Sequence, residues 1–153
     1  MALQVGDSMP HFTAKDAQGN VFDSRSVIGK KPLVVYFYPK DNTRICTAQA
    51  CSFRDQYADF KALGAEVIGV SRDSFASHQE FSNQYQLPFR LLSDGNGKLR
   101  KLFGVPTKFF GLIPGRVTYV INKEGIVIMV FNAASEGKLH IYKALETLRN
   151  NTH

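Results

Sequence analysis

The chain has 153 residues and is 44% hydrophobic, so we expect one globular domain over residues 1–153 that buries about 70% of its unfolded surface. Its net charge of +6 comes from 19 basic and 13 acidic residues. The basic residues are scattered and form no continuous stripe, which argues against a nucleic-acid partner. No apolar run approaches the roughly 20 residues of a membrane span, and the N-terminus lacks the pattern of a secretory signal. We therefore expect a cytoplasmic protein, with the plastid as the alternative if a transit peptide has been removed.

The first predicted elements are a β-hairpin and a buried strand. Residues 11–14 and 20–24 flank the turn signal Ala17-Gln18-Gly19, which predicts the hairpin. Leu33–Tyr38 is an apolar and aromatic run rich in β-branched side chains, typical of a buried parallel strand. Pro39 ends this strand because proline has no N–H to donate to a neighbouring strand.

A pattern of helical period follows the polar residues that end at Thr43. Apolar residues and a glycine recur at i, i+4, i+7 and i+11, namely Phe53, Tyr57, Phe60 and Gly64. This spacing predicts one amphipathic helix after the central strand.

The second half of the chain alternates strands with helices. The predicted elements are, in order, a strand over Glu66–Ser71, a helix over Phe75–Gln86 capped by Ser74, a strand over Phe89–Ser93, a helix over Lys98–Phe103 closed by Gly104, two hairpin strands over Val117–Asn122 and Ile126–Phe131, and a final helix capped by Ser135 with the apolar stripe Ile141, Tyr142, Leu145 and Leu148. This order indicates an α/β protein with the thioredoxin fold and an N-terminal β-hairpin extension.

Both cysteines of the chain, Cys46 and Cys51, lie at the junction between the central strand and its helix. A thiol in the first turn of a helix meets unpaired N–H groups and the positive end of the helix dipole. That position lowers a thiol pKa from about 8.5 and favours a nucleophilic thiolate. The alternatives are a buried structural cysteine at position 46, and a zinc site, for which a nearby pair of histidines is missing.

The cysteines belong to a pattern that resembles the peroxiredoxins. Pro39, Thr43 and Cys46 stand in the spacing P-x-x-x-T-x-x-C, and Cys51 follows as it does in the bacterioferritin-comigratory branch. The block Phe103–Gly125 is similar to peroxiredoxin Q of cyanobacteria and plastids. The resemblance covers nearly the whole chain. It implies a thioredoxin-dependent thiol peroxidase for hydrogen peroxide and organic hydroperoxides, with no metal or organic cofactor, and we expect a monomer.

The resemblance also implies a role for each site residue. Cys46 is the peroxidatic thiolate that becomes a sulfenic acid, and Cys51 resolves it as an intramolecular Cys46–Cys51 disulfide. Thr43 and Arg116 contact the thiolate and the peroxide oxygens, and Pro39 shields the pocket. From the residues alone, Thr43 is equally a plain N-cap, and Arg116 is better explained as a solvated loop arginine.

The spacing of the two cysteines predicts a conformational change. On an intact helix, residues five apart are rotated by about 140° and offset by about 7.5 Å along the axis. The resulting Cα separation of about 9 Å exceeds the roughly 7 Å limit for a disulfide. We therefore expect the first turns of the helix to unwind before Cys46 and Cys51 can join, with faster amide exchange over Thr43–Arg54 in the oxidised form.

Two departures and two rival functions remain open. Arg44-Ile45 stands where many relatives have Pro-Gly, and Gln49 stands where the wider group has Glu. A redox sensor would use the same disulfide to signal, but would consume about one equivalent of peroxide where an enzyme consumes many. A thioredoxin-type reductase is disfavoured because four residues separate the cysteines where C-x-x-C has two.

Overall fold

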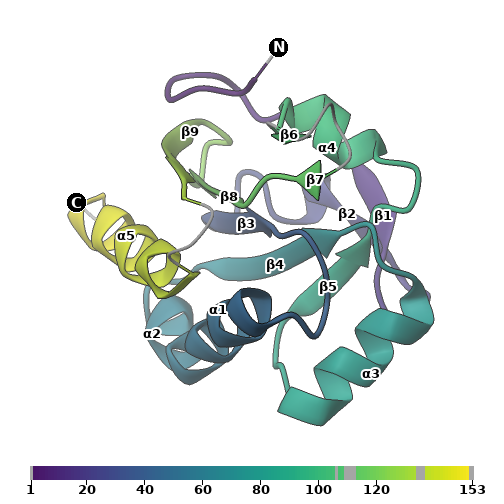
Figure 1. Cartoon of the computed structure of the whole chain (residues 1–153). Coiled ribbons are helices and arrows are strands. Elements are labelled where there is room, and N and C mark those ends of the chain that lie inside the picture. Colours follow the sequence, from purple (N-terminus) through teal and green to yellow (C-terminus); the bar gives the residue numbers. More distant parts are fainter. Residues whose placement is uncertain (1, 106, 109–112, 134–136, 152–153) are drawn as a thin grey trace.

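A central five-stranded sheet organises the fold (Figure 1). The computed structural model describes residues 2–105, 107–108, 113–133 and 137–151. The strands of the sheet, in the spatial order β5-β4-β3-β8-β9, are β5 (Arg90–Ser93), β4 (Glu66–Ser71), β3 (Leu33–Phe37), β8 (Val117–Ile121) and β9 (Val127–Asn132). Strands β3, β4 and β5 run parallel, and β8 and β9 are each antiparallel to the preceding neighbour. The predicted α/β class and thioredoxin fold are confirmed.

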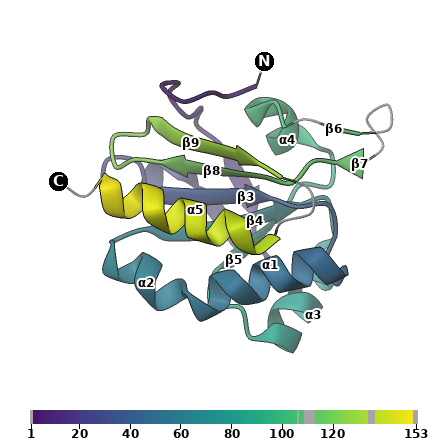
Figure 2. The same cartoon turned by 60° about the vertical axis from the view of Figure 1, so that its left-hand side comes forward.

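Helices cover both faces of this sheet (Figures 1 and 2). One face carries α1 (Arg44–Asp55), α2 (Tyr57–Ala62), α3 (Phe75–Tyr85) and α5 (Gly137–Asn150), and the other carries α4 (Lys98–Phe103) and the N-terminal hairpin. Because side chains alternate along a strand, Val34 and Tyr36 of β3 face the first layer, and Leu33, Val35 and Phe37 face the second. The continuous apolar run of β3 is therefore explained by burial on both faces. No helix in the described part of the chain is long and apolar enough to cross a membrane.

In the part of the chain that the structure describes, two small sheets and a short 3₁₀ helix accompany the central sheet. They are the predicted hairpin of β1 (Thr13–Lys15) and β2 (Val21–Asp23), the 3₁₀ helix Ser24–Ser26, and a pair that the sequence does not predict, β6 (Thr107–Lys108) and β7 (Ile113–Pro114). The hairpin turn is closed by the Asp16 carboxylate, which accepts the N–H groups of Gln18 at 3.0 Å and Asn20 at 2.9 Å. Gly19 supplies the left-handed backbone of this turn, with φ of +84°.

Two details of the predicted helices are wrong. The long helix is two helices, since Gln56 leaves the helical region with φ of −100° and ψ of 6° and separates α1 from α2. In α5, Tyr142 is 59% exposed, because it follows the buried Ile141 by one residue and so lies about 100° further around the helix. Ala144 joins the buried stripe in its place. The predicted Ser135 cap lies outside the described residues.

A glycine makes room for the aromatic cluster under α1. Tyr36 of β3 pairs in register with Gly69 of β4, and its ring stacks on Phe53 of α1 at 4.5 Å between ring centroids. A Cβ added at Gly69 would lie 2.8 Å from the Cζ and Oη atoms of Tyr36 and 2.9 Å from a methyl carbon of Leu91. These side chains are buried, so neither can swing away from the clash.

We expect Gly69→Ala to lower the free energy of unfolding of the reduced protein by about 2 kcal/mol, because overpacking a closed core typically costs 1–3 kcal/mol. Urea denaturation followed by far-UV circular dichroism measures the change. Gly95→Ala is the matched control, since nothing lies within 4 Å of its added Cβ. Equal midpoints for the two variants would contradict the steric argument.

Candidate active site

The loop from β3 to α1 places Cys46 in the first turn of the helix. Strand β3 ends at Phe37, Thr43 has an extended backbone at the N-cap position, and α1 begins at Arg44. Cys46 is therefore the third helical residue, as the sequence predicted. It is 1% exposed and packs in the core cluster that contains Tyr36, whose pKa is raised well above 10 by burial first and by the neighbouring Cys46 second.

The first turn of α1 lacks a side-chain cap. Thr43 holds the N-cap position, but its exposed hydroxyl donates to the carbonyl of Lys40 at 3.0 Å and makes no capping hydrogen bond. The predicted cap by the Thr43 side chain is therefore wrong, although its position is right. Arg44 is exposed at the first helical position, and the first turn contains no acidic residue. Neither a cap nor a favourable charge supports this turn.

Packing against α5 supports the first turn instead. Gly137, the first residue of α5, lies so close to α1 that an added Cβ would be 3.0 Å from the Ile45 carbonyl oxygen and 3.2 Å from the Cβ of Gln49. The two helices lie side by side in both views (Figures 1 and 2). Further along α5, the buried His140 faces the Thr118 hydroxyl of β8 at 2.7 Å and the Ala133 carbonyl at 2.9 Å, and burial lowers its pKa to about 4. His140 therefore stays neutral at pH 7 and fixes α5 to the sheet.

Arg116 lies near the end of β3 from which the chain leads to Cys46. It precedes Val117 of β8, which pairs with Phe37 at the end of β3. Its side chain is 4% exposed, and Nη1 donates to Oε1 of Gln49 at 2.6 Å. Since Gln49 is one helical turn after Cys46, the structure brings Arg116 to the cysteine helix. The interpretation of Arg116 as a solvated loop arginine is wrong.

Gln49 is a site residue to which the sequence analysis assigned no role. It is fully buried on α1, and the hydrogen bond from Arg116 identifies its Oε1 as the acceptor. Within the described residues, its Nε2 is a buried donor with no hydrogen-bond partner. The sequence offered one signal for this role. Gln49 follows Cys46 by three residues, so the two lie near the same face of the helix, and Gln49 is polar where the other residues of that face are apolar.

Cys51 lies on the same unbroken helix as Cys46, and both cysteines are free thiols. The intact α1 is the state in which helical geometry separates the two Cα atoms by about 9 Å. Burial raises the pKa of the Cys51 thiol, so this thiol stays protonated at neutral pH. Neither cysteine belongs to a cluster that could ligate a metal among residues 2–105, 107–108, 113–133 and 137–151.

Pro39 follows β3 and is half-buried, between the strand and the loop that leads to Thr43. Four of the five predicted residues therefore lie close together in the sequence. Pro39 and Thr43 are in the loop between β3 and α1, and Cys46 and Cys51 are on α1. The fifth, Arg116, is the one that the chain brings in from a distance.

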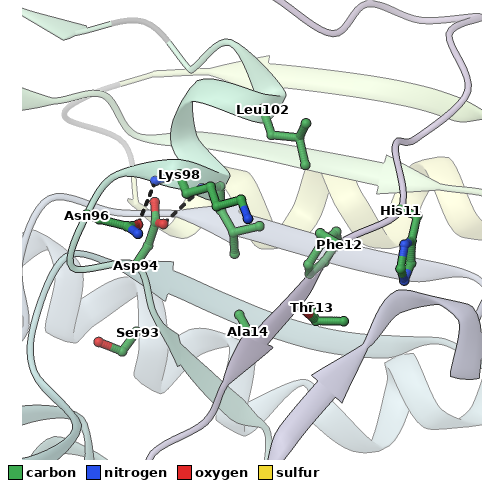
Figure 3. A pocket seen from close by; sticks show the side chains of 10 residues that line it. His11, Phe12, Thr13, Ala14, Ser93, Asp94, Asn96, Lys98 and Leu102 are labelled. Atoms are coloured by element: carbon green, nitrogen blue, oxygen red, sulfur yellow. Dashed lines mark hydrogen bonds between the residues drawn. The ribbon is translucent and has the colours of Figure 1, made fainter.

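A separate cavity of about 430 Å³ lies on the opposite face of the sheet (Figure 3). His11, Thr13, Asn96 and Lys98 are among the residues that line it. The Asp94 carboxylate, also in its wall, accepts the N–H groups of Leu99 at 2.9 Å and Arg100 at 3.0 Å. Asp94 and Asn96 thus stabilise the turn before α4, His11 pairs with Asp23, and none of the predicted site residues lines the cavity.

Comparison with known proteins places these features in one family. The model of the AhpC/TSA family matches residues 5–130. Peroxiredoxin Q from the chloroplast of Sedum lineare is 50% identical over 145 residues, 95% of this chain and 77% of that protein. Its counterpart from Arabidopsis thaliana is 48% identical over 147 residues, 96% of this chain and 68% of that protein.

Solved structures agree with the sequence comparison. Peroxidoxin BcpB of Mycobacterium tuberculosis superimposes with a TM-score of 0.89 at 31% identity, covering 97% of this chain and 98% of that one. The bacterioferritin comigratory protein of Xanthomonas campestris, whose structures concern alkyl peroxide reduction, superimposes with a TM-score of 0.84 at 28% identity, covering 99% of this chain and 98% of that one.

Proposed function

Because the chain belongs to the AhpC/TSA family and, within it, to the peroxiredoxins of the peroxiredoxin Q type, we propose that Cys46 is its peroxidatic residue and Cys51 its resolving residue. The chain is a thiol peroxidase, an oxidoreductase that uses a hydroperoxide and a thioredoxin-type reductant. One observation above all supports this residue assignment. Arg116 donates a 2.6 Å hydrogen bond to Gln49 of α1, which lies one helical turn from Cys46.

The first step transfers one oxygen atom from the peroxide to sulfur. The Cys46 thiolate attacks the terminal oxygen of the hydroperoxide, the O–O bond breaks, and the leaving alkoxide takes a proton to become an alcohol or water. Cys46 is oxidised by two electrons to a sulfenic acid. Negative charge moves from sulfur to the leaving oxygen, so a fixed cation beside the reacting atoms lowers the barrier.

We assign this role to Arg116. Its guanidinium is buried at the helix that holds Cys46, where electrostatic interactions are stronger than in water. The hydrogen bond to Gln49 helps to fix the orientation of its planar fork. Thr43 would contribute a donor to the peroxide only after its hydroxyl leaves the Lys40 carbonyl. Pro39 borders the same loop and limits water access.

The second step requires α1 to open. The Cys51 thiol must attack the Cys46 sulfenic sulfur to form the S–S bond and release water. On an intact helix the two Cα atoms are too far apart for this bond to form. Unwinding also moves Cys51 into water, which reverses the burial that raises its pKa and increases its thiolate fraction. A dithiol reductant of the thioredoxin type then reduces the disulfide by thiol–disulfide exchange.

The relatives also inform where the protein works. The most similar proteins that we compared carry the chloroplast in their names, which supports the plastid alternative. The cytoplasmic location and the monomeric state stay predictions, which fractionation and light scattering can test.

The resolving role of Cys51 is tested by Cys51→Ser. We expect one fast turnover followed by arrest, because the Cys46 sulfenic acid then has no thiol partner and oxidises further to the sulfinic acid. The measurements are peroxide consumed per mole of protein in the presence of thioredoxin, thioredoxin reductase and NADPH, and mass spectrometry of Cys46. Ser52→Ala, the neighbouring residue on α1, controls for damage to the helix and should keep full turnover. Undiminished turnover in Cys51→Ser would exclude an obligatory intramolecular disulfide.

A further inference from the structure

A buried polar cluster joins the loop between β3 and α1 to the rest of the molecule. Asp41, in the middle of this loop, has a side chain only 2% exposed. Its carboxylate accepts the Tyr38 hydroxyl at 2.6 Å and the Ser77 hydroxyl at 2.8 Å, and it lies 2.7 Å from Nδ1 of His78. The loop is therefore tied to Tyr38, the residue directly after β3, on one side and to α3 on the other.

His78 is the centre of this cluster. It is fully buried on α3, and its Nε2 lies 3.0 Å from the carbonyl oxygen of Leu92 on β5. A carbonyl oxygen can only accept, so Nε2 carries a proton and the ring orientation is determined. The imidazole thus bridges β5 to Asp41 through its two nitrogens.

The backbone of the loop has its own attachment. The Asp41 N–H donates to Oδ2 of Asp73 at 2.8 Å, and the same oxygen accepts the Ser71 hydroxyl at 2.7 Å. Ligand atoms of Asp41, Asp73 and His78 lie within 4.8 Å of one another, a spacing that a metal site would share. Each of these side chains is already hydrogen-bonded within the cluster, so we interpret the arrangement as a structural latch.

The residue after the latch turns the backbone. Asn42 has φ of +60°, a left-handed conformation that asparagine adopts more readily than most non-glycine residues. The N-cap residue Thr43 follows, and α1 begins at Arg44 with no side-chain cap on its first turn. At the far end of α1, Nη1 of Arg54 donates to the Tyr85 carbonyl of α3 at 2.8 Å. The segment between Asn42 and Arg54, which contains both cysteines, is therefore anchored at its two ends, and its first turn depends on packing against α5 because it has no side-chain cap.

We propose that the Asp41–His78 pair is a positioning device for the peroxidase reaction. It holds the loop that carries Pro39 and Thr43 against α3, and it confines the unwinding of α1 to residues after Asn42. This inference rests on the proposed roles of Cys46 and Cys51. His78 and Asp41 touch neither the peroxide nor the sulfur, and they act through the position of the loop.

Two substitutions at His78 separate the bond to Asp41 from the bond to Leu92. An Asn side chain places its amide nitrogen near Nδ1 and can still donate to Asp41, whereas a Gln side chain reaches toward Nε2 and loses Asp41. Measured in a Cys51→Ser background, His78→Gln should slow oxidation of Cys46 by hydrogen peroxide about 10- to 100-fold, the effect of a misplaced reaction site. His78→Asn should stay within about threefold of the parent, because it keeps the contact with the loop.

A second readout excludes a merely structural effect. Alkylation of Cys46 by iodoacetamide needs no peroxide pocket, so both variants should react at nearly the rate of the parent. Phe81→Leu, a buried change on the same helix at a side chain that packs against Tyr38 but cannot hydrogen-bond Asp41, is the control for loss of packing in α3 and should alter neither rate. Equal peroxide rates for the Asn and Gln variants, or a parallel loss of alkylation, would overturn the proposal. Full turnover in Cys46→Ser would instead refute the proposed function.

Amide hydrogen exchange tests the fixed end of the opening segment. In the oxidised protein we expect residues 44–50 to exchange faster than in the reduced protein, while the Asp41 amide stays protected by Asp73 in both forms. His78→Gln should release the Asp41 amide in both. If the Asp41 amide of the oxidised wild type exchanged as fast as residues 44–50, the latch would open with the helix and the proposal would fail.

Discussion

Peroxide turnover should disappear when Cys46 is replaced by Ser. A hydroxyl is almost completely protonated at neutral pH and is a far weaker nucleophile than a thiolate, so the attack on the O–O bond has no competent atom. The expected loss is about 10⁴-fold or more, the scale seen when a covalent nucleophile is removed. NADPH oxidation coupled through thioredoxin reductase and thioredoxin measures it.

The comparison variants make this result specific. Cys46→Ser changes one buried atom, so its thermal midpoint should lie near that of the reduced wild type, and loss of activity cannot be assigned to unfolding. In the wild type, many equivalents of peroxide should be consumed per mole of protein. Consumption of about one equivalent, even with reductant in excess, would favour the redox-sensor function, and retained turnover in Cys46→Ser would refute the mechanism.

The second large effect is expected at Arg116. Arg116→Met removes the buried cation beside the cysteine helix and should lower kcat/KM for hydrogen peroxide about 10²- to 10³-fold, the typical cost of losing one preorganised group that stabilises developing charge. Arg116→Lys keeps the charge without the planar fork and should fall between the wild type and the Met variant. Initial rates at several peroxide concentrations measure both.

Arg90→Met provides the matched control for removing an arginine. Arg90 is exposed on the edge strand β5, where its Nε lies 3.8 Å from the Asp16 carboxylate, and its loss should leave kcat/KM unchanged. Thermal unfolding of each variant shows whether the Arg116 variants are folded at the assay temperature. A folded Arg116→Met with kcat/KM within threefold of the wild type would remove Arg116 from the reaction.

Local sequence patterns were enough to predict most of the strands and helices. The apolar run of Leu33–Tyr38 predicted the buried strand β3, which ends one residue earlier, and the predicted bounds of β4 and α4 agree with the structure. The Ser74 cap is confirmed by the bond that its hydroxyl accepts from the Ser77 N–H. These features depend on propensity, periodicity and capping within one segment, which a sequence displays directly.

Local patterns failed where a neighbouring segment decides the outcome. Periodicity predicted one helix through Phe53 and Phe60, and it could not reveal that Gln56 interrupts it while both rings stay buried. The Thr43 side chain was expected to cap α1, but the loop turns so that its hydroxyl meets the Lys40 carbonyl instead. A break in a helix and the choice between two nearby acceptors depend on how the chain packs around them.

The sequence by itself determined where the reactive thiol should lie. The strand, the loop and the helix that place a cysteine three residues after Thr43 in a first helical turn are adjacent in the chain, so each can be predicted from local sequence. Only the tertiary structure showed how distant groups meet the helix that carries this cysteine. Arg116 and Gln49 are 67 residues apart and meet because β8 pairs antiparallel with β3, which brings the start of one strand to the end of the other. Asp41 and His78, 37 residues apart, meet because α3 packs beside the loop. Long-range pairing of this kind follows from the register of a sheet and the packing of a core, neither of which is written in any one segment.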